Sequence, residues 1–67
     1  MTITCNGEAV STTACSLADL LTARLGEPAP PGVAVAVNGE VLPRSVWAAP
    51  LLLEGDVVEI VTAVQGG

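Results

Sequence analysis

The sequence contains no histidine, phenylalanine or tyrosine, and it has only two cysteines. The absence of histidine excludes imidazole acid–base chemistry and the usual nitrogen ligands of metal ions. Cys5 and Cys15 are spaced in a way that matches no zinc-binding or redox motif. We therefore expect no catalytic residue and no metal site in this chain. Both thiols are expected to be free, buried and apolar in character.

A long hydrophobic run is also missing. No stretch approaches the roughly 18 to 20 apolar residues of a transmembrane helix. Met1 leads into a strand-like segment instead of a signal sequence. We therefore expect a cytoplasmic, unprocessed protein without a membrane partner. With 67 residues, the chain should form one domain over 1–67 that is modestly stable and too small for an enzyme cleft.

Basic residues are scarce. Two of them stand against seven acidic residues, which gives a net charge of −5. A negative surface repels the phosphate backbone of nucleic acids, so we expect no nucleic-acid partner. A protein partner with a basic face is one interpretation of this charge, and ordinary solubility is the other.

Two Asn-Gly pairs predict two β-hairpins, because this dipeptide suits the tightest hairpin turn. Around Asn6-Gly7, the expected register pairs Ile3 with Val10 on one face of the sheet. Asn38-Gly39 follows a run of alternating valine and alanine. A last, mostly apolar run should form the central strand of the sheet. The expected strands cover residues 1–5, 8–13, 33–37, 40–42 and 57–64.

One short amphipathic helix is predicted between the hairpins. Ser16 is suited to be its N-cap, Asp19 places a negative charge in the first turn, and Gly26 is suited to follow the last turn. The helix should run from Leu17 to about Leu25 and pack on the sheet. Its apolar stripe is expected to consist of Leu17, Leu20, Leu21 and Leu25.

The core must be mainly aliphatic, because Trp47 is the single aromatic residue. We expect this indole to cover one edge of the core with its N–H at the surface. The three leucines at 51–53 should pack beside it. Arg44 has two interpretations, binding to an acidic edge of a partner or solvation of a turn.

The order of elements predicts an α+β fold, in which one helix lies across one face of a mixed sheet of four to five strands. The last strand should pair parallel with the first. Four segments then carry a resemblance to a known family: Val37-Asn38-Gly39-Glu40, Pro43-Arg44 with Trp47, Glu54-Gly55-Asp56 before Val57 to Ile60, and Gly66-Gly67. In this order and spacing, the chain resembles the ThiS family of ubiquitin-like β-grasp sulfur carriers in thiamine thiazole biosynthesis.

The resemblance implies a flexible C-terminal Gly-Gly tail at 64–67 and a function for its last residue. Gly67 would be adenylated by an E1-like adenylyltransferase of the ThiF type, which would use ATP and Mg²⁺, and then converted to a thiocarboxylate. The sulfur would come through a cysteine desulfurase or a rhodanese, and thiazole synthase of the ThiG type would take it. The chain itself would bind no cofactor and would not be an enzyme.

The terminal residues suit this chemistry. An α-carboxylate is ionised at neutral pH and attacks the α-phosphate of ATP, and glycine has no side chain to block the acyl carbon. Val64, Gln65 and Gly66 would thread the tail through a narrow tunnel in the partner. A Gly-Gly end also arises by chance in about one chain in 200.

A docking surface is expected on the open face of the sheet, next to the tail. Its residues are Ala34 and Ala36 of one strand and Val61 and Ala63 of the last strand. The other interpretation is that scattered exposed aliphatic side chains are normal in proteins.

Other functions share this pattern. The small subunit of molybdopterin synthase and the carriers for tRNA thiolation or cysteine synthesis would use the same terminal chemistry with a different acceptor. A ubiquitin-like modifier joined to lysine, or a β-grasp adaptor with an unreactive tail, belongs to a different class. The segment with Pro43, Arg44 and Trp47 and the short length favour the thiamine carrier.

Overall fold

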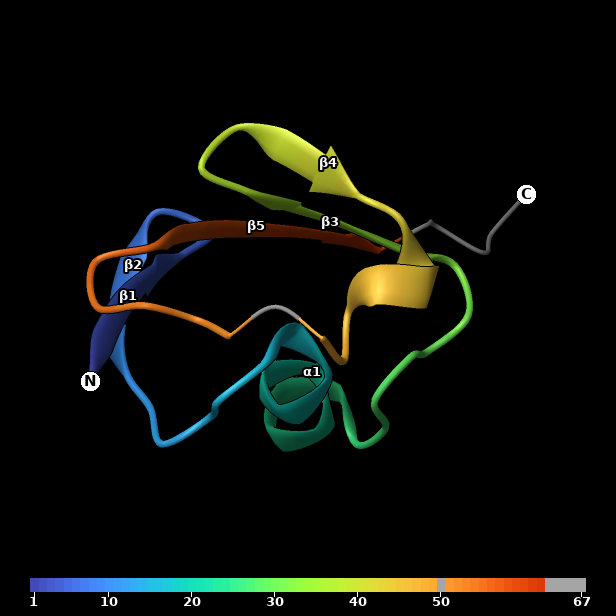
Figure 1. Cartoon of the computed structure of the whole chain (residues 1–67), viewed down its shortest axis with the longest axis horizontal. Helices are drawn as coiled ribbons and strands as arrows, with labels where there is room; N and C mark the ends of the chain where they lie inside the picture. Colours follow the sequence, from blue (N-terminus) through green and yellow to red (C-terminus); the bar gives the residue numbers. More distant parts are fainter. Residues whose placement is uncertain (50, 63–67) are drawn as a thin grey trace.

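The computed structural model describes residues 1–49 and 51–62. Within them, a sheet of five strands is covered on one face by an α-helix, as Figure 1 shows. The elements in chain order are β1 (Thr2–Cys5), β2 (Glu8–Ser11), α1 (Leu17–Leu25), β3 (Val33–Val37), β4 (Glu40–Leu42), the 3-10 turn η1 (Arg44–Val46) and β5 (Val57–Thr62). No helix in the described part of the chain is long and apolar enough to cross a membrane.

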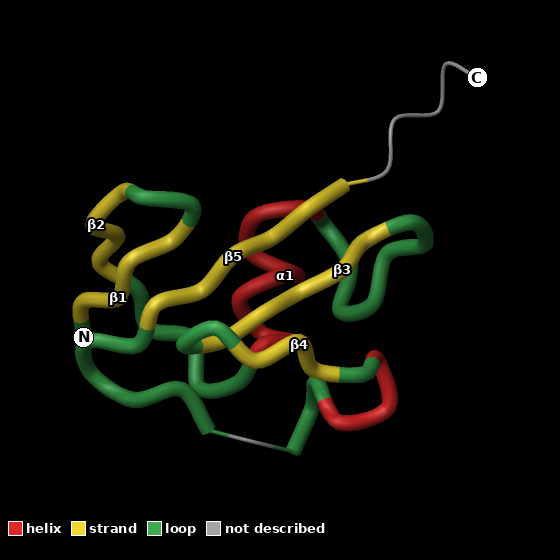
Figure 2. The backbone as a smooth tube through the Cα atoms, turned by 90° about the horizontal axis from the view of Figure 1, so that it is seen from above, coloured by secondary structure: helices red, strands yellow, loops and turns green. Residues whose placement is uncertain are grey.

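The last strand lies at the centre of the sheet, whose order is β2-β1-β5-β3-β4. β5 runs parallel to β1 and antiparallel to β3, and the two hairpins form the flanks. Figure 2 shows β5 between β1 and β3, with α1 on the far side of the sheet. The predicted α+β fold, the central position of the last strand and its parallel pairing with the first are therefore confirmed.

Both hairpins turn on their Asn-Gly pairs, as predicted. Asn6 and Asn38 each have a φ of 51°, and the glycines that follow them also have positive φ values. A two-residue turn of this kind requires positive φ at both central residues, and glycine and asparagine tolerate it best. Ile3 pairs with Val10 in the expected register. The return strand β2 ends at Ser11 rather than near Thr13.

The early end of β2 has a local cause. The Thr12 N–H still donates to the carbonyl of Met1, at 2.9 Å, but the Thr12 hydroxyl then accepts a hydrogen bond from the Ala14 N–H at 3.0 Å. This side-chain contact competes with strand pairing and turns the chain toward α1.

α1 begins and ends as predicted. The Ser16 hydroxyl accepts a hydrogen bond from the Asp19 N–H at 3.2 Å, and Gly26 is left-handed with a φ of 89°. The four-leucine stripe is wrong in its last member, because Leu25 is 40% exposed while Leu21 is fully buried. Eight residues at about 100° each leave Leu25 about 80° around the helix from Leu17, so it turns away from the sheet.

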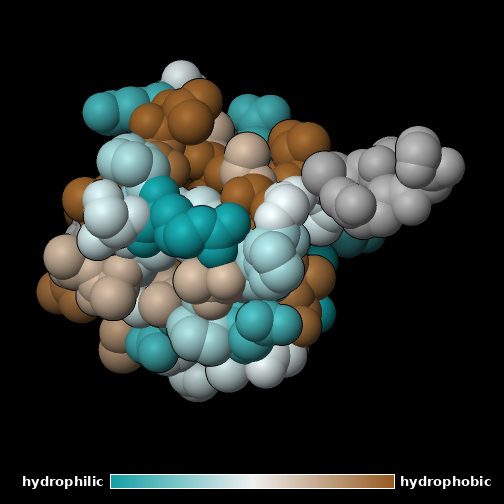
Figure 3. Space-filling view, turned by 90° about the vertical axis from the view of Figure 1, so that its right-hand side faces the viewer, coloured by the Kyte–Doolittle hydropathy of each residue, from teal (hydrophilic) through white to brown (hydrophobic). Residues whose placement is uncertain are grey.

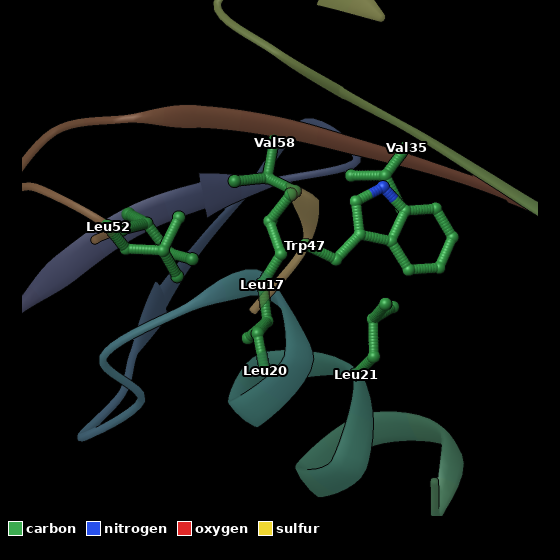
Figure 4. Close-up of a cluster of buried hydrophobic side chains, with 8 residues drawn as sticks. Leu17, Leu20, Leu21, Val35, Trp47, Leu52 and Val58 are labelled. Atoms are coloured by element: carbon green, nitrogen blue, oxygen red, sulfur yellow. The ribbon is translucent and has the colours of Figure 1, made fainter. Parts of the chain in front are cut away.

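The core lies between α1 and the sheet. Its buried members are Ile3, Leu17, Leu20, Leu21, Val35, Trp47, Leu52 and Val58. Figure 4 shows the Trp47 indole between Val35 of β3 and Leu21 of α1. The ring is only 3% exposed, and its Nε1–H donates to the Leu42 carbonyl at 3.0 Å. The prediction of a surface N–H is therefore wrong, because the end of β4 supplies the acceptor that water would otherwise provide.

Two further predictions of burial were wrong in part. Leu52 is buried, but its neighbours Leu51 and Leu53 are 69% and 66% exposed. Successive side chains of an extended segment point in opposite directions, so only Leu52, the middle leucine, faces the core. Cys5 is buried and Cys15 is exposed, and both are free. Cys15 lies in the connection before the helix, where its carbonyl accepts from the Leu52 N–H and its side chain faces outward.

Candidate functional site

The candidate site is the end of β5, because the segment predicted to carry the chemistry follows this strand directly. The five predicted site residues at its end, Ala63, Val64, Gln65, Gly66 and Gly67, lie outside the described residues. The structure shows the base from which they leave. β5 pairs with β3 up to Thr62, which lies opposite Val33.

Asn6 holds β5 on one side. Main-chain pairing between β1 and β5 reaches Cys5 and Val58, and the Asn6 N–H then donates to the Val58 carbonyl at 2.9 Å. The Asn6 side chain continues the ladder toward the end of β5. Its Oδ1 accepts from the Ile60 N–H at 2.7 Å, and its Nδ2 donates to the Ile60 carbonyl at 3.1 Å. The Asn6 carboxamide therefore makes the two hydrogen bonds to Ile60 that the main chain of a longer β1 strand would make.

Asn38 holds the other end of β5. Its N–H donates to the Val57 carbonyl at 2.7 Å, and its Oδ1 accepts from the Val57 N–H at 2.9 Å. Its Nδ2 also donates to Asp56 at 3.1 Å. Sequence reasoning assigned both asparagines to turns and missed these contacts. The available signal was that both turns use asparagine, whose side-chain amide can donate and accept at the same time.

Replacement of Asn6 by glycine should loosen the end of β5 without breaking the hairpin. Glycine keeps the positive φ but removes two hydrogen bonds, which we expect to cost about 1–3 kcal/mol of unfolding free energy. Amide hydrogen exchange should accelerate most at Ile60. The matched variant Asn38→Gly should accelerate exchange at Val57 instead. Equal acceleration along the whole strand in both variants would contradict these separate roles.

The open face of the sheet, which points away from α1, carries the predicted docking residues that the structure describes. Val58 of β5 is buried in the core, so Val57, Glu59 and Val61 alternate onto the open face. Ala34 lies opposite Val61 in the neighbouring strand. Val61 is 63% exposed. The predicted grouping of Ala34, Ala36 and Val61 on one exposed face is present.

A shallow hollow of about 110 Å³ lies on this open face. It is lined by Ala34, Val35, Ala36, Val41, Glu59 and Val61. The two alanines leave space between the larger side chains around them. Figure 3 shows apolar surface gathered toward the top of the view, on the side away from α1. Val41, which is 73% exposed, was missed as a docking residue, although its place between Glu40 and Leu42 put it on this face.

Arg44 begins η1, which lies on the α1 side of the sheet and not on the open face. Its Nη1 donates to the carbonyls of Ala29 and Pro30 at 2.6 and 3.0 Å, and its guanidinium lies 5.0 Å from the centroid of the Trp47 ring. Arg44 therefore ties the proline-rich loop to the core through hydrogen bonds and a cation–π contact. This structural role differs from both interpretations drawn from the sequence.

Metal ligands are not grouped in the described part of the chain, where no three histidine, cysteine, aspartate or glutamate residues lie close enough to hold an ion. Cys15 borders a separate hollow of about 310 Å³ with Met1, Thr12 and Leu51 among its lining residues.

Comparison with known proteins decides the family. The model of the ThiS family matches residues 2–67. The chain belongs to the ThiS family. A crystal structure of thiamine biosynthesis protein ThiS from Geobacter metallireducens is 31% identical, with a TM-score of 0.81, and the match covers 100% of both chains. The ubiquitin-like β-grasp fold and the family resemblance are confirmed.

A second structure agrees with this assignment. The solution structure of a thiamine biosynthesis protein from the same organism is 33% identical to this ThiS-family chain, with a TM-score of 0.79. The match covers 100% of this chain and 88% of the other. The search of curated proteins found no match.

Proposed function

We propose that this ThiS-family protein is a sulfur carrier in thiamine biosynthesis, and that Gly67 carries the sulfur as a thiocarboxylate. The observation that supports the proposal is the match to the ThiS family over residues 2–67, which includes the Gly66-Gly67 end. The related structures from Geobacter metallireducens are thiamine biosynthesis proteins.

The proposed chemistry proceeds in two steps at the terminal carboxyl group. A carboxylate oxygen of Gly67 attacks the α-phosphate of ATP, so that an acyl-adenylate forms and pyrophosphate leaves. A sulfur atom delivered through a cysteine desulfurase or rhodanese-type donor then attacks the acyl carbon and displaces AMP. The donor holds this sulfur as a persulfide, so the product is an acyl disulfide. A thiol then attacks the donor's sulfur, so that a disulfide forms between that thiol and the donor and the thiocarboxylate is released, from which thiazole synthase takes the sulfur.

This chain acts in these steps as a co-substrate. The E1-like adenylyltransferase supplies the nucleotide site and Mg²⁺. Val64, Gln65 and Gly66 carry the carboxyl group into its pocket, and β5 with its two asparagine contacts provides a fixed base for that arm. A rigid base is useful because the reacting atoms must meet within a few tenths of an ångström.

Intact-mass measurement after incubation with the activating enzyme, Mg-ATP and a sulfur donor tests the proposal. The expected product has one oxygen replaced by sulfur. Larger conjugates joined through lysine would support the ubiquitin-like modifier instead, and an unchanged mass would support the unreactive adaptor. A chain extended by one alanine after Gly67 is the matched control, because it keeps the fold and the glycines but moves the carboxylate.

The acceptor is tested separately. The thiocarboxylated protein should return to its original mass when it is mixed with thiazole synthase and that enzyme's other substrates. Sulfur loss only with the large subunit of molybdopterin synthase, or only with enzymes of tRNA thiolation or cysteine synthesis, would assign the carrier to those acceptors.

The open face of the sheet is the proposed docking surface for the activating enzyme, with Ala34, Ala36, Val61 and Ala63 as its residues. We expect Val61→Asp to weaken the complex by about tenfold or more, since a charge buried in an apolar contact costs over 1.4 kcal/mol. Titration calorimetry measures this change. Leu53→Asp is the matched control, because Leu53 has a similar exposure of 66% but lies outside this hollow. Equal affinities of both variants would reject the surface.

A further inference from the structure

The open face of the sheet combines apolar side chains with one charge. Of the residues that β3, β4 and β5 place on this face, Glu59 is the charged one. Ala36 lies opposite it on β3, and Val57 and Val61 flank it along β5. Its carboxylate therefore borders the 110 Å³ hollow from within an apolar surface.

Glu59 differs in its surroundings from the three carboxylates that have a structural role. Asp19, Glu54 and Asp56 accept hydrogen bonds from backbone or side-chain donors and thereby stabilise turns and caps. Glu59 is exposed and accepts no hydrogen bond from a described residue, as is also true of Glu8, Glu27 and Glu40, but of these four it alone lines the hollow. Glutamate is mildly disfavoured in strands, and Glu59 stands in the middle of the central strand.

The positively charged groups of this chain lie too far from Glu59 to form an ion pair with it. Arg44 is held on the other layer by Ala29, Pro30 and Trp47. Arg24 lies in the last turn of α1, which covers the opposite face of the sheet. The sequence has only these two basic residues, and the Met1 ammonium donates to the Thr12 carbonyl at 3.1 Å. A cation that pairs with Glu59 therefore comes from another molecule.

The hollow beside Glu59 has the size for an apolar side chain. Its volume of about 110 Å³ is well above the roughly 10–15 Å³ that a cavity needs to hold one water molecule. Its lining is aliphatic apart from Glu59. A partner surface that fits here presents a branched aliphatic side chain for the hollow and a positive charge beside it.

We propose that the protein that takes up the C-terminal segment recognises this face with a lysine or arginine on Glu59 and an aliphatic side chain in the adjoining hollow. The inference rests on the proposed function, and it adds the charge of the partner. Val61 lines the hollow and directly precedes Thr62, the last described residue, so a partner that holds the segment after Thr62 is next to the hollow. An ion pair bordered by apolar contacts selects the partner and accelerates association more than it adds affinity.

Stopped-flow binding of the activating enzyme tests this inference with three variants. Glu59→Lys should lower the association rate constant by about tenfold or more, because like charges then meet at the contact. Glu59→Gln should lower it less and should flatten its dependence on salt. Glu27→Lys makes the same change of charge at an exposed position after α1 and should change the rate less than twofold.

The outcomes separate this inference from the proposed function. An equal effect of Glu59→Lys and Glu27→Lys, or an unchanged salt dependence in Glu59→Gln, would overturn the inference even if the wild-type protein gains sulfur. Binding that depends on Glu59, without any gain of sulfur in the wild-type protein, would overturn the proposed function alone. Urea unfolding of each variant shows that the fold is intact, as the exposure of Glu59 leads us to expect.

Discussion

Removal of Gly66 and Gly67 is expected to abolish sulfur loading while the domain stays folded. Among the described residues, the core extends no further along β5 than Ile60, and glycine has no side chain, so the deletion removes no side chain from the core. The new terminal carboxylate would belong to Gln65 and would lie about 7 Å short of its original reach. Since a displacement of about 1 Å can lower a rate by a hundredfold, we expect no measurable adenylation.

Growth of cells that lack their own thiamine sulfur carrier measures this effect. The full-length chain should restore growth without added thiamine, and the shortened chain should not. Gly67→Ala is the matched control, since it keeps the length and adds one methyl group at the acyl carbon. We expect partial growth from that variant. Full growth with the shortened chain would show that the last two glycines have no chemical role.

Leu21→Ala is expected to remove much of the stability of the domain. Leu21 is fully buried, and Figure 4 shows it directed at Trp47 and Val35. Substitutions of this kind cost about 2–5 kcal/mol, through the lost transfer energy and the cavity left behind. A domain of 67 residues has about 3–10 kcal/mol of unfolding free energy at the usual 0.05–0.15 kcal/mol per residue. The midpoint of urea unfolding should therefore fall sharply.

Leu25→Ala is the control for this change, because it alters the same residue type on the same helix. Leu25 is 40% exposed, and alanine has the highest helix propensity, so the expected loss is below about 1 kcal/mol. Similar losses for the two variants would mean that Leu25 packs in the core as firmly as Leu21.

Local chemistry explains why much of the fold could be predicted from the sequence. The Asn-Gly turns, the Ser16 cap and the left-handed Gly26 each act within a few residues, and the structure has all of them as expected. The spacing of apolar residues predicted where the strands lie and which face of the helix packs on the sheet. The family resemblance gave the fold that the comparisons confirm.

Some errors were local, such as the end of β2 and the exposure of Leu25, but several concern contacts between distant segments. Trp47 is covered by the end of β4, and Arg44 is drawn to the proline-rich loop, because folding brings these segments together. The asparagine contacts to β5 and the exposed thiol of Cys15 have the same origin. Sequence spacing specifies which faces are apolar, and it does not specify which carbonyl lies near a given side chain.

The candidate site was only partly accessible from the sequence. The pairing of Ala34 with Val61 follows from the hairpin and from a central last strand, so the open face could be predicted. Val41 and Glu59 were missed, although strand alternation places both on this face, because the hollow that they line forms only when three strands lie side by side. The role of Gly67 stays a prediction.

Fragment mass analysis can locate the sulfur directly. The protein is incubated with the activating enzyme, Mg-ATP and a donor charged from isotopically labelled cysteine, and is then cleaved into peptides. We predict one labelled sulfur atom in the peptide that ends at Gly67, in place of one carboxyl oxygen, and none in the peptides with Cys5 or Cys15. Label on the exposed Cys15, or a protein without label, would contradict a carrier that holds sulfur on its terminal carboxyl group.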